Sequence, residues 1–268
     1  SARLQEKGWR VHGFDQNKTG LRETLSATPR PRIIWLMVPS GRTVHNLIGE
    51  LVPMLERGDI ILDGGNSYFE DSVQRAKQLL KRGIHFLDVG VSGGPEGART
   101  GLSVMVGGEK KIFEKVKHLF QDISVPDGYN YMGKSGAGHF VKMVHNGIEY
   151  GMMQAIAEGF TVMKKSAFRL DLKKIAEVYN HRSVIESRLI GWLKKAYEEH
   201  GGELETMSSA VGYTGEGEWT VKTAQKLKIK TPVIKGAFQF RVKSKKNPSY
   251  AGRVLTALRN QFGGHSIK

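Results

Sequence analysis

Three polar side chains that could carry out acid–base chemistry lie at helical spacing between Gly133 and Tyr150, in GKSGAGHFVKMVHNGIEY. Asn146 follows Lys142 by four residues and Glu149 follows it by seven. Seven residues at ~100° each fall only about 20° short of two full turns, so the three side chains would share one helix face. The glycine-rich turn at 136–138 would open this helix, and the positive end of the helix dipole disfavours an ammonium group in its first turns. The pattern predicts a lysine base and a glutamic acid for a reaction that removes one proton and delivers another. The alternative is a solvated polar stripe with a chance Lys–Glu spacing.

Composition restricts the classes of function. The chain has 268 residues, no cysteine and a formal net charge of +15. Disulfides and cysteine-based metal sites are therefore excluded, and no other convincing ligand cluster is present, so we expect no metal. No apolar run approaches the ~18 residues of a membrane span and no signal peptide is legible, which predicts a cytoplasmic protein that is not bound to a membrane. Glutamates lie between the basic residues and no nucleic-acid-binding motif is visible, so the charge favours a phosphorylated or carboxylated small molecule over nucleic acid.

The pattern of apolar and polar residues changes along the chain, which predicts two domains at residues 1–137 and 138–268. In the first, apolar runs alternate with amphipathic stretches, as in an α/β Rossmann-type doubly wound parallel sheet. The expected strands are Trp9–Phe14, Arg32–Val38, Ile60–Asp63, His85–Asp88 and Ser103–Val106, and the expected helices are Thr43–Arg57, Tyr68–Arg82 and Lys110–Phe120. The pattern of residues 138–268 predicts an all-α domain with loops near 201–202, 212–217 and 245–248.

Turn residues follow each expected strand, where ligands of such sheets bind. Asp15 ends the first strand in GFDQN, and a carboxylate there can accept hydrogen bonds from ribose hydroxyls and repel a 2′-phosphate. Glycine-containing turns follow the next three strands, at 39–41, 64–66 and 92–95. Ordinary turn chemistry explains any one of them, but their recurrence predicts a dinucleotide site that prefers NAD to NADP.

The expected beginning of such a domain is absent. A dinucleotide-binding domain starts with a strand and a G-x-G-x-x-G turn, whereas SARLQEKGWR has the character of the helix that follows that turn. The connection from Asp15 to Ile33 is also short for a full crossover. We therefore expect the first strand and its glycine loop to precede residue 1 in the complete protein, and a further piece to be missing near Leu25.

Five motifs together resemble the short form of the 6-phosphogluconate dehydrogenase (decarboxylating) family, within the β-hydroxyacid dehydrogenase superfamily. They are DGGNSYFED at 63–71, DVGVSGGPEGA at 88–98, GAGHFVKMVHNGIEYGMMQ at 136–154, GEGEWTV at 215–221 and RNQFGGH at 259–265. They span nearly the whole chain in family order. The helix motif and the RNQFGGH tail are specific, whereas the wider superfamily shares the SGG turn.

The resemblance implies the oxidation and decarboxylation of 6-phosphogluconate to ribulose 5-phosphate and CO2, a reaction of the pentose phosphate pathway and gluconate utilization. By position in the motif, Lys142 is the base that takes the hydroxyl proton and Glu149 is the acid that protonates the enediol. His145 and Asn146 would hydrogen-bond the substrate near the reacting carbons. The further residues implied as substrate ligands are Asn66, Ser92, Gly93, Gly94, Tyr150, Arg259 and His265. Those implied for the cofactor, NAD with NADP less favoured, are Asp15, Gln16, Val38, Pro39, Ser40 and Asn66.

The tail and two acidic residues raise separate questions. Arg259 and His265 match family residues that complete a neighbouring subunit's site, which implies a homo-oligomer, either a dimer or a tetramer; the alternative is a frayed basic C-terminus. Longer relatives place phosphate ligands where this chain has Thr214 and Glu216, and an arginine where it has Glu186. Arg182 or Arg188 are the expected substitutes for that arginine.

Three rival functions stay open at this point. A β-hydroxyacid dehydrogenase for a non-phosphorylated acid would share the fold and Lys142 without needing His145, Glu149 or the tail. A binding protein without catalysis would retain the fold alone. A nucleic-acid-binding protein would bind unrelated oligonucleotides in a salt-dependent way.

Overall fold

A computed structural model describes residues 2–15 and 20–267, so Gln16, predicted as a cofactor contact, lies outside the described residues. The chain forms two compact units, Ser1–Met143 and Val144–Lys268. They divide within one long helix, α7 (Ala137–Lys165), a few residues after the domain boundary expected at 137/138.

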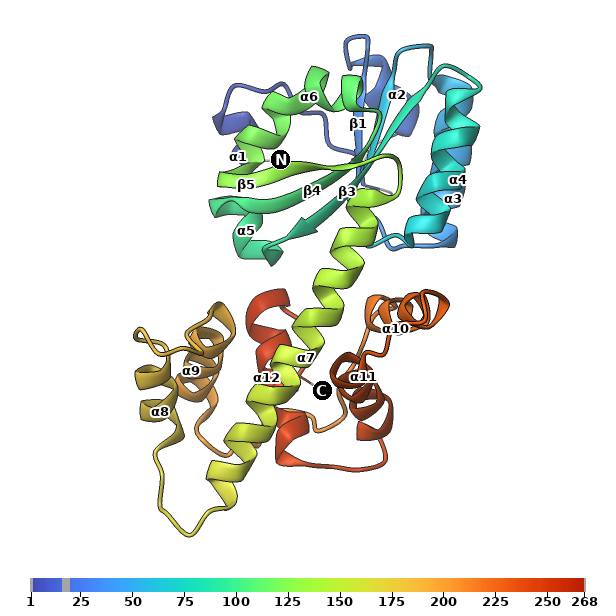
Figure 1. The fold of residues 1–268 in the computed structure, drawn as a ribbon. Helices are drawn as coiled ribbons and strands as arrows, with labels where there is room; N and C mark the ends of the chain where they lie inside the picture. The colour runs from blue at the N-terminus through green and yellow to red at the C-terminus, as the bar shows by residue number, and fades with distance from the viewer. Residues whose placement is uncertain (1, 16–19, 268) are drawn as a thin grey trace. The chain divides into compact units, whose positions relative to one another are not determined.

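The first unit is a five-stranded sheet with helices on both faces (Figure 1). Its strands, in the spatial order of the sheet, are β1 (Ile33–Leu36), β2 (Ile60–Asp63), β3 (His85–Ser92), β4 (Leu102–Gly108) and β5 (Ser124–Gly133). Its helices are α1 (Ala2–Glu6), α2 (Leu21–Ser26), α3 (Arg42–Leu51), the 3-10 turn η1 (Val52–Met54), α4 (Phe69–Leu80), α5 (Gly94–Thr100) and α6 (Lys110–Ile123).

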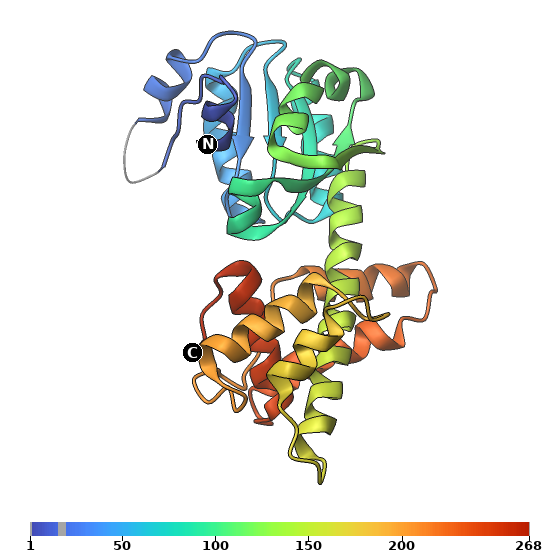
Figure 2. The same cartoon turned by 90° about the vertical axis from the view of Figure 1, so that its left-hand side faces the viewer.

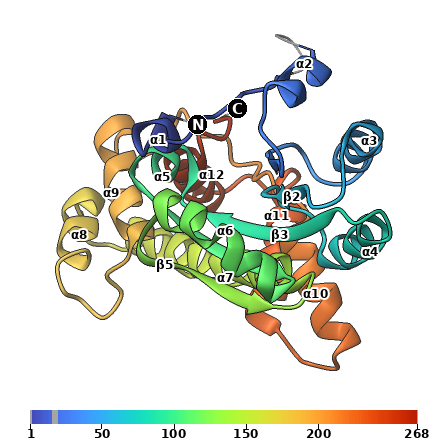
Figure 3. The same ribbon diagram turned by 90° about the horizontal axis from the view of Figure 1, so that it is seen from above.

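Alternating residues of the strands pack into two separate cores. Ile60, Leu62 and Leu87 face α6, whereas Ile61 and Phe86 face the opposite layer, to which α3 and α4 contribute. A strand that is buried on both faces reads as a continuous apolar run, which is why β2 was predicted with its observed bounds. Figure 3 shows α3 and α4 side by side at the edge of this layer. The doubly wound architecture predicted from the sequence is confirmed.

Two details of the sheet differ from the prediction. The strand expected at Trp9–Phe14 is wrong, because the described segment 9–15 forms no strand. Trp9 is instead fixed to α6, where its ring stacks on His118 at a centroid distance of 4.8 Å and its Nε1 donates to Asp122 at 2.7 Å. The sheet is also not wholly parallel, since β3 and β4 pair antiparallel, and β5, which the sequence did not predict, pairs with β4.

The second unit consists of helices in its described part (Figure 2). After α7 come α8 (Leu172–Tyr179), α9 (Arg188–His200), α10 (Glu216–Lys226), α11 (Pro232–Ser244) and α12 (Tyr250–Gly263). One core joins α7, α8, α9 and α12 through residues such as Phe160, Leu193 and Leu255. Side-chain caps begin three of these helices: Asp171, Ser187 and Ser249 each accept a bond from a backbone N–H in the first turn. Among residues 2–15 and 20–267, no helix has the length and apolar character needed to cross a membrane.

Candidate active site

The start of α7 is fixed to the sheet by a buried carboxylate. Asp88 of β3 is fully buried, and its two oxygens accept hydrogen bonds from the backbone N–H groups of Gly136 (2.7 Å) and His139 (3.0 Å). These donors belong to the first turn of the helix, where they have no partner within the helix. A negative charge there is also favoured by the helix dipole. Asp88 therefore sets where α7 begins, and with it the position of every side chain in its first turns.

Glycines allow the first turns of α7 to lie directly against β3 and β4. A Cβ on Gly138 would lie 2.4 Å from the carbonyl oxygen of Asp88 and 2.5 Å from that of Met105. A Cβ on Gly90 would lie 2.5 Å from Cβ of Lys142. This close approach buries Lys142, which is 7% exposed, beside the middle of β3. The helix predicted to open at the glycine turn is confirmed, and its lysine is buried rather than part of a solvated stripe.

His139 connects the same helix start to the turn after β2. Its Nε2 lies 3.0 Å from the carbonyl oxygen of Asp63, and its Nδ1 lies 2.7 Å from the hydroxyl of Ser72. The Asp63 carboxylate accepts from Ser67 at 2.8 Å and from Arg75 at 3.3 Å. The glycine turn at 64–66 is thus held from both ends, and it exposes the side chain of Asn66 at the carboxyl end of β2.

The other predicted residues of the first unit also lie at carboxyl ends of strands. Ser92 is the last residue of β3, and Gly93 and Gly94 follow it with φ of 137° and 62°, values that favour glycine. Val38, Pro39 and Ser40 follow β1, with Pro39 and Ser40 exposed. Asp15 is exposed at the end of the described N-terminal segment. Apart from Asp15, these residues belong to successive parallel strands, where an open α/β sheet binds its ligands.

In the second unit, α7 and the start of α10 form a short hydrogen-bonded chain. The Nδ1 of His145 lies 2.9 Å from Oδ1 of Asn146, and the Nδ2 of Asn146 donates to Oε1 of Glu216 at 3.2 Å. His145 Nδ1 also lies 4.0 Å from a carboxylate oxygen of Glu149. Asn146 and Glu216 are both buried. The side chains predicted to contact the reacting carbons are therefore already held in fixed orientations within this unit.

A basic cluster adjoins this chain. The guanidinium carbon of Arg241 lies 3.4 Å from the ring centroid of Tyr150, a cation–π contact, and Arg241 is 2% exposed. Burial raises the pKa of the Tyr150 hydroxyl, an effect that the charge of Arg241 opposes. Burial also lowers the pKa of Arg241 and of Arg259, and in both cases the Tyr150 and Glu149 charges act in the opposite direction. Burial, followed by the charges of Arg259 and Arg241, lowers the pKa of His265.

The tail that carries Arg259 and His265 folds back on its own unit. Gly264 ends α12 in the left-handed conformation, with φ of 61°. The side-chain amide of Asn260 donates to the carbonyl of His265 at 2.9 Å, and the backbone N–H of Ser208 donates to the carbonyl of Ile267 at 2.7 Å. The alternative of a frayed C-terminus is therefore wrong for the described residues. Arg259 interacts electrostatically with Tyr150, Glu149 and Glu216 of the same chain.

Arg241, the arginine of this cluster that lies over Tyr150, was not predicted from the sequence. Glu186 lies exposed in the loop before α9, where it accepts a bond from the backbone N–H of Arg182 at 2.9 Å. Arg188 lies over the ring of Trp192, at 4.7 Å from its centroid. The buried guanidinium beside Tyr150 comes from Arg241 on α11 instead. The signal that could have found it is an arginine inside the apolar run GAFQFRV, where burial of a charge requires a reason.

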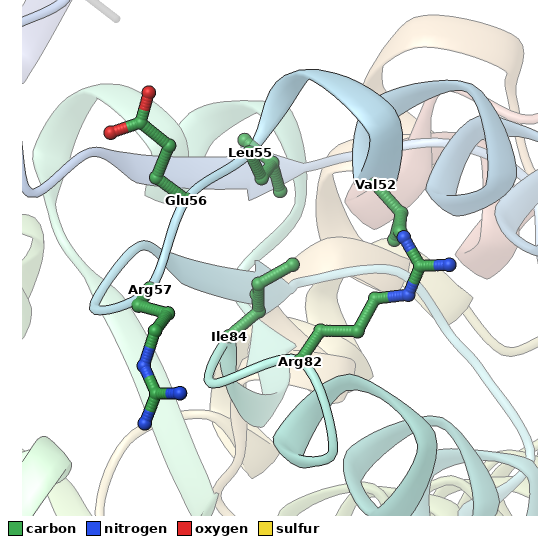
Figure 4. A pocket seen from close by; sticks show the side chains of 6 residues that line it. All are labelled: Val52, Leu55, Glu56, Arg57, Arg82 and Ile84. Atoms are coloured by element: carbon green, nitrogen blue, oxygen red, sulfur yellow. The ribbon is translucent and has the colours of Figure 1, made fainter.

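A hollow of about 640 Å³ lies elsewhere on the first unit (Figure 4). Its lining residues are Val52, Leu55, Glu56, Arg57, Arg82 and Ile84. They come from the segments that lead into β2 and β3, so this hollow is at the amino ends of the strands. The predicted ligand residues lie at the opposite, carboxyl ends. Among the described residues, no group of His, Asp and Glu side chains has an arrangement that could hold a metal ion.

Comparison with known proteins agrees with this arrangement. Residues 1–133 match the NAD binding domain of 6-phosphogluconate dehydrogenase, and residues 138–266 match the C-terminal domain of the same enzyme. The chain belongs to the 6-phosphogluconate dehydrogenase family. The family resemblance inferred from the five motifs is thereby confirmed.

Individual relatives within the 6-phosphogluconate dehydrogenase family differ in length and cofactor. The YqeC protein of Bacillus subtilis, a candidate 6-phosphogluconate dehydrogenase by name, is 45% identical over 94% of this chain and 84% of its own. The NAD(+)-dependent, decarboxylating enzyme of Haloferax volcanii is 39% identical over 87% of this chain and 78% of its own. The Plasmodium falciparum 6-phosphogluconate dehydrogenase, solved in apo form and with NADP+ and 6-phosphogluconate, superimposes with a TM-score of 0.76 at 31% identity. The match covers 91% of this chain and 53% of the Plasmodium chain. The chain thus spans about half the length of that longer relative.

Proposed function

We propose that the protein oxidises and decarboxylates 6-phospho-D-gluconate to D-ribulose 5-phosphate and CO2, with NAD as the preferred hydride acceptor. The observation that carries the proposal is the face of α7 on which a buried Lys142 precedes Asn146 and Glu149 by one and two turns. In this role Lys142 accepts the proton of the hydroxyl group that is oxidised. Glu149 later delivers a proton to the carbon that has lost CO2. General acid–base steps of this kind contribute ~10²–10⁴-fold to a rate.

The basic cluster of the second unit supports an anionic substrate. Arg241 lies over the ring of Tyr150 and Arg259 interacts electrostatically with the same residue, so two guanidinium groups adjoin Tyr150, and His265 interacts with both of them. Guanidinium groups bind phosphate through paired N–H donors and keep their charge at all physiological pH values. Burial of these cations lowers their pKa, so a bound dianion would relieve an unfavourable environment. This favours a phosphorylated acid over the non-phosphorylated 3-hydroxy acid kept as the alternative.

The described residues of the first unit fit a nicotinamide dinucleotide. The turn Val38–Ser40 follows β1 and leads through Gly41 into the N-terminus of α3. A Cβ on Gly65 would lie 2.8 Å from the carbonyl oxygen of Val38, so the turns after β1 and β2 are in close contact. Exposed backbone N–H groups at such a helix start suit the phosphates of a dinucleotide. When bound, the nicotinamide supplies the acceptor for the hydride, and Asp15 would select NAD by repelling a 2′-phosphate.

We also propose that the enzyme is a homo-oligomer. Ile148, Met152 and Val162 form an apolar stripe at helical spacing on α7, and they are 51%, 46% and 71% exposed in the single chain. Exposed apolar stripes of this kind are typical of subunit interfaces. In such an oligomer, Arg259 and His265 would complete the neighbouring site implied by the resemblance or the site of their own chain, where Arg259 interacts electrostatically with Tyr150 and Glu149.

The test of the proposed reaction is 6-phosphogluconate-dependent reduction of NAD and of NADP, measured in parallel with release of CO2 from the complete protein. Reduction of NAD with one CO2 per NADH supports both the reaction and the cofactor preference. Reduction of NADP alone keeps the reaction and contradicts the preference. Reduction with a non-phosphorylated 3-hydroxy acid, without reaction of 6-phosphogluconate, favours the alternative.

A further inference from the structure

Glu216 is a buried carboxylate with one oxygen that no described group satisfies. Its side chain is 2% exposed, and only Oε1 has a donor, the Nδ2 of Asn146. Oε2 is buried and has no hydrogen-bond partner. A buried charged acceptor without a donor is costly, and such groups in folded proteins call for a specific reason.

The start of α10 cannot move Glu216 away from α7, because the two helices are in close contact on either side of it. A Cβ on Gly217 would lie 2.4 Å from the ring of Tyr150, and a Cβ on Gly147 would lie 2.6 Å from the side chain of Thr220. The hydroxyl of Thr220 in turn donates to the carbonyl of Glu216 at 2.8 Å. The carboxylate is therefore presented to Asn146 by the packing of two helices, and does not depend on a flexible loop.

Through Asn146, Glu216 also determines the chemical state of the His145 ring. A carboxylate accepts only, so the amide of Asn146 must present its NH2 group to Glu216 and its oxygen to His145. The oxygen requires a proton on Nδ1 of His145. In the neutral ring the lone pair then resides on Nε2, which makes that nitrogen the acceptor or base.

The surroundings of the second oxygen define what it can bind. Glu216 acts electrostatically on Tyr150, Arg259 and His265, so it adjoins the cluster assigned above to the anionic end of the substrate. Direct contact between its carboxylate and a phosphate would be repulsive. A hydroxyl group has a proton to donate, and a sugar acid carries several hydroxyl groups next to its anionic end.

We propose that Glu216 is a positioning and specificity residue: its Oε1 orients Asn146 and through it His145, and its Oε2 accepts a hydrogen bond from a hydroxyl of a bound sugar-acid phosphate. This inference rests on the proposed function for the identity of the substrate. The orientation of His145 does not depend on it.

Two substitutions separate the two oxygens, and a third is the control. Glu216→Gln keeps an oxygen for Asn146 and replaces the second acceptor by an NH2 donor. Glu216→Ala removes both oxygens. Glu218→Gln makes the same change in the first turn of the same helix, where Glu218 pairs with Lys222 at 2.6 Å. Each variant is assayed for kcat and KM with 6-phosphogluconate and with its 4-deoxy and 5-deoxy analogues. The tautomer of His145 is read by ¹⁵N NMR of the substrate-free protein, with the signal assigned from a His145→Gln spectrum.

We expect Glu216→Gln to keep the Nδ1–H tautomer and to lose roughly 10- to 100-fold in kcat/KM. The deoxy analogue that lacks the donating hydroxyl should lower the kcat/KM of the wild type by a similar factor. It should lower the kcat/KM of Glu216→Gln little further. Glu216→Ala should lose the single tautomer and lower kcat as well, and Glu218→Gln should behave as wild type.

Three results would overturn the inference. An unchanged tautomer in Glu216→Ala contradicts the positioning role. The hydroxyl contact is contradicted if the loss of kcat/KM from Glu216→Gln and the loss from the deoxy analogue multiply when the two are combined. A lower KM in Glu216→Gln contradicts it as well. If Glu216→Ala does not fold, the glutamine variant still decides the hydroxyl contact, and Asn146→Ala, which also breaks the chain of bonds, decides the tautomer. A wild-type enzyme that does not oxidise 6-phosphogluconate refutes the proposed function and the hydroxyl contact, and the NMR result separately decides the positioning role.

Discussion

Gly138 is the position at which the contact between α7 and the sheet can be tested most directly. An added Cβ would lie 2.4 Å and 2.5 Å from two carbonyl oxygens and 2.7 Å from the backbone nitrogen of Gly107. All three atoms belong to paired strands, so no side chain can rotate to make room. Helical alanine is normally better than glycine by ~1 kcal/mol, but overpacking a rigid site costs about 1–3 kcal/mol or more. We expect a cost at the upper end of the range for overpacking. After the gain in helix propensity is subtracted, the net loss in the free energy of unfolding is about 2 kcal/mol or more.

The matched control is Gly49→Ala on α3, in the same unit. Gly49 is exposed, and nothing lies within 4 Å of an added Cβ. There the helix propensity acts alone, and we expect stabilisation by ~0.5–1 kcal/mol. The two variants should thus shift the urea midpoint in opposite directions, and Gly138→Ala should also lower kcat because Lys142 lies one turn away. Equal urea midpoints for the two variants would refute the close packing of α7 against β3 and β4.

The remaining predictions concern the site. Lys142→Met should lower kcat at least 10²-fold without changing the urea midpoint. Glu149→Gln should lower kcat because an amide is not a comparable acid. A near-normal kcat in either variant would contradict the role assigned to that residue. Asp15→Ala should reduce the ratio of kcat/KM for NAD to that for NADP, and an unchanged ratio would place the selection elsewhere. His265 has a pKa below its usual ~6.5, so the unfolded chain binds the proton more readily. Stability should therefore fall as pH drops from ~6.5 through the lowered pKa, and urea midpoints should show a weaker fall in His265→Gln. Mixed oligomers of Lys142→Met and Arg259→Ala chains should stay inactive if each tail serves its own chain; recovered activity would show a shared site.

Much of this protein is legible in its sequence because local patterns express it. Apolar runs and helical spacing predicted β2 with its observed bounds and α4 and α6 to within a few residues, since burial on one or both faces leaves a direct periodic signature. The spacing of Lys142, Asn146 and Glu149 on one helix face is likewise a property of the chain alone. The five motifs were sufficient to identify the family.

Tertiary structure decided the rest, because it brings together residues that are far apart in sequence. Trp9–Phe14 has the composition of a strand, but Trp9 is held by His118 and Asp122 of α6 and the segment pairs with no strand. The burial of Lys142 depends on Asp88 and on close contact with β3, which no local pattern contains.

The buried guanidinium beside Tyr150 comes from Arg241 on another helix, and the carboxylate that holds Asn146 comes from Glu216, 70 residues further along the chain. Helix packing selects such partners by shape, and the energy of a buried charge depends on neighbours that only the folded chain supplies. The sequence by itself therefore determined which chemical groups α7 carries, and the fold determined which groups hold them in place.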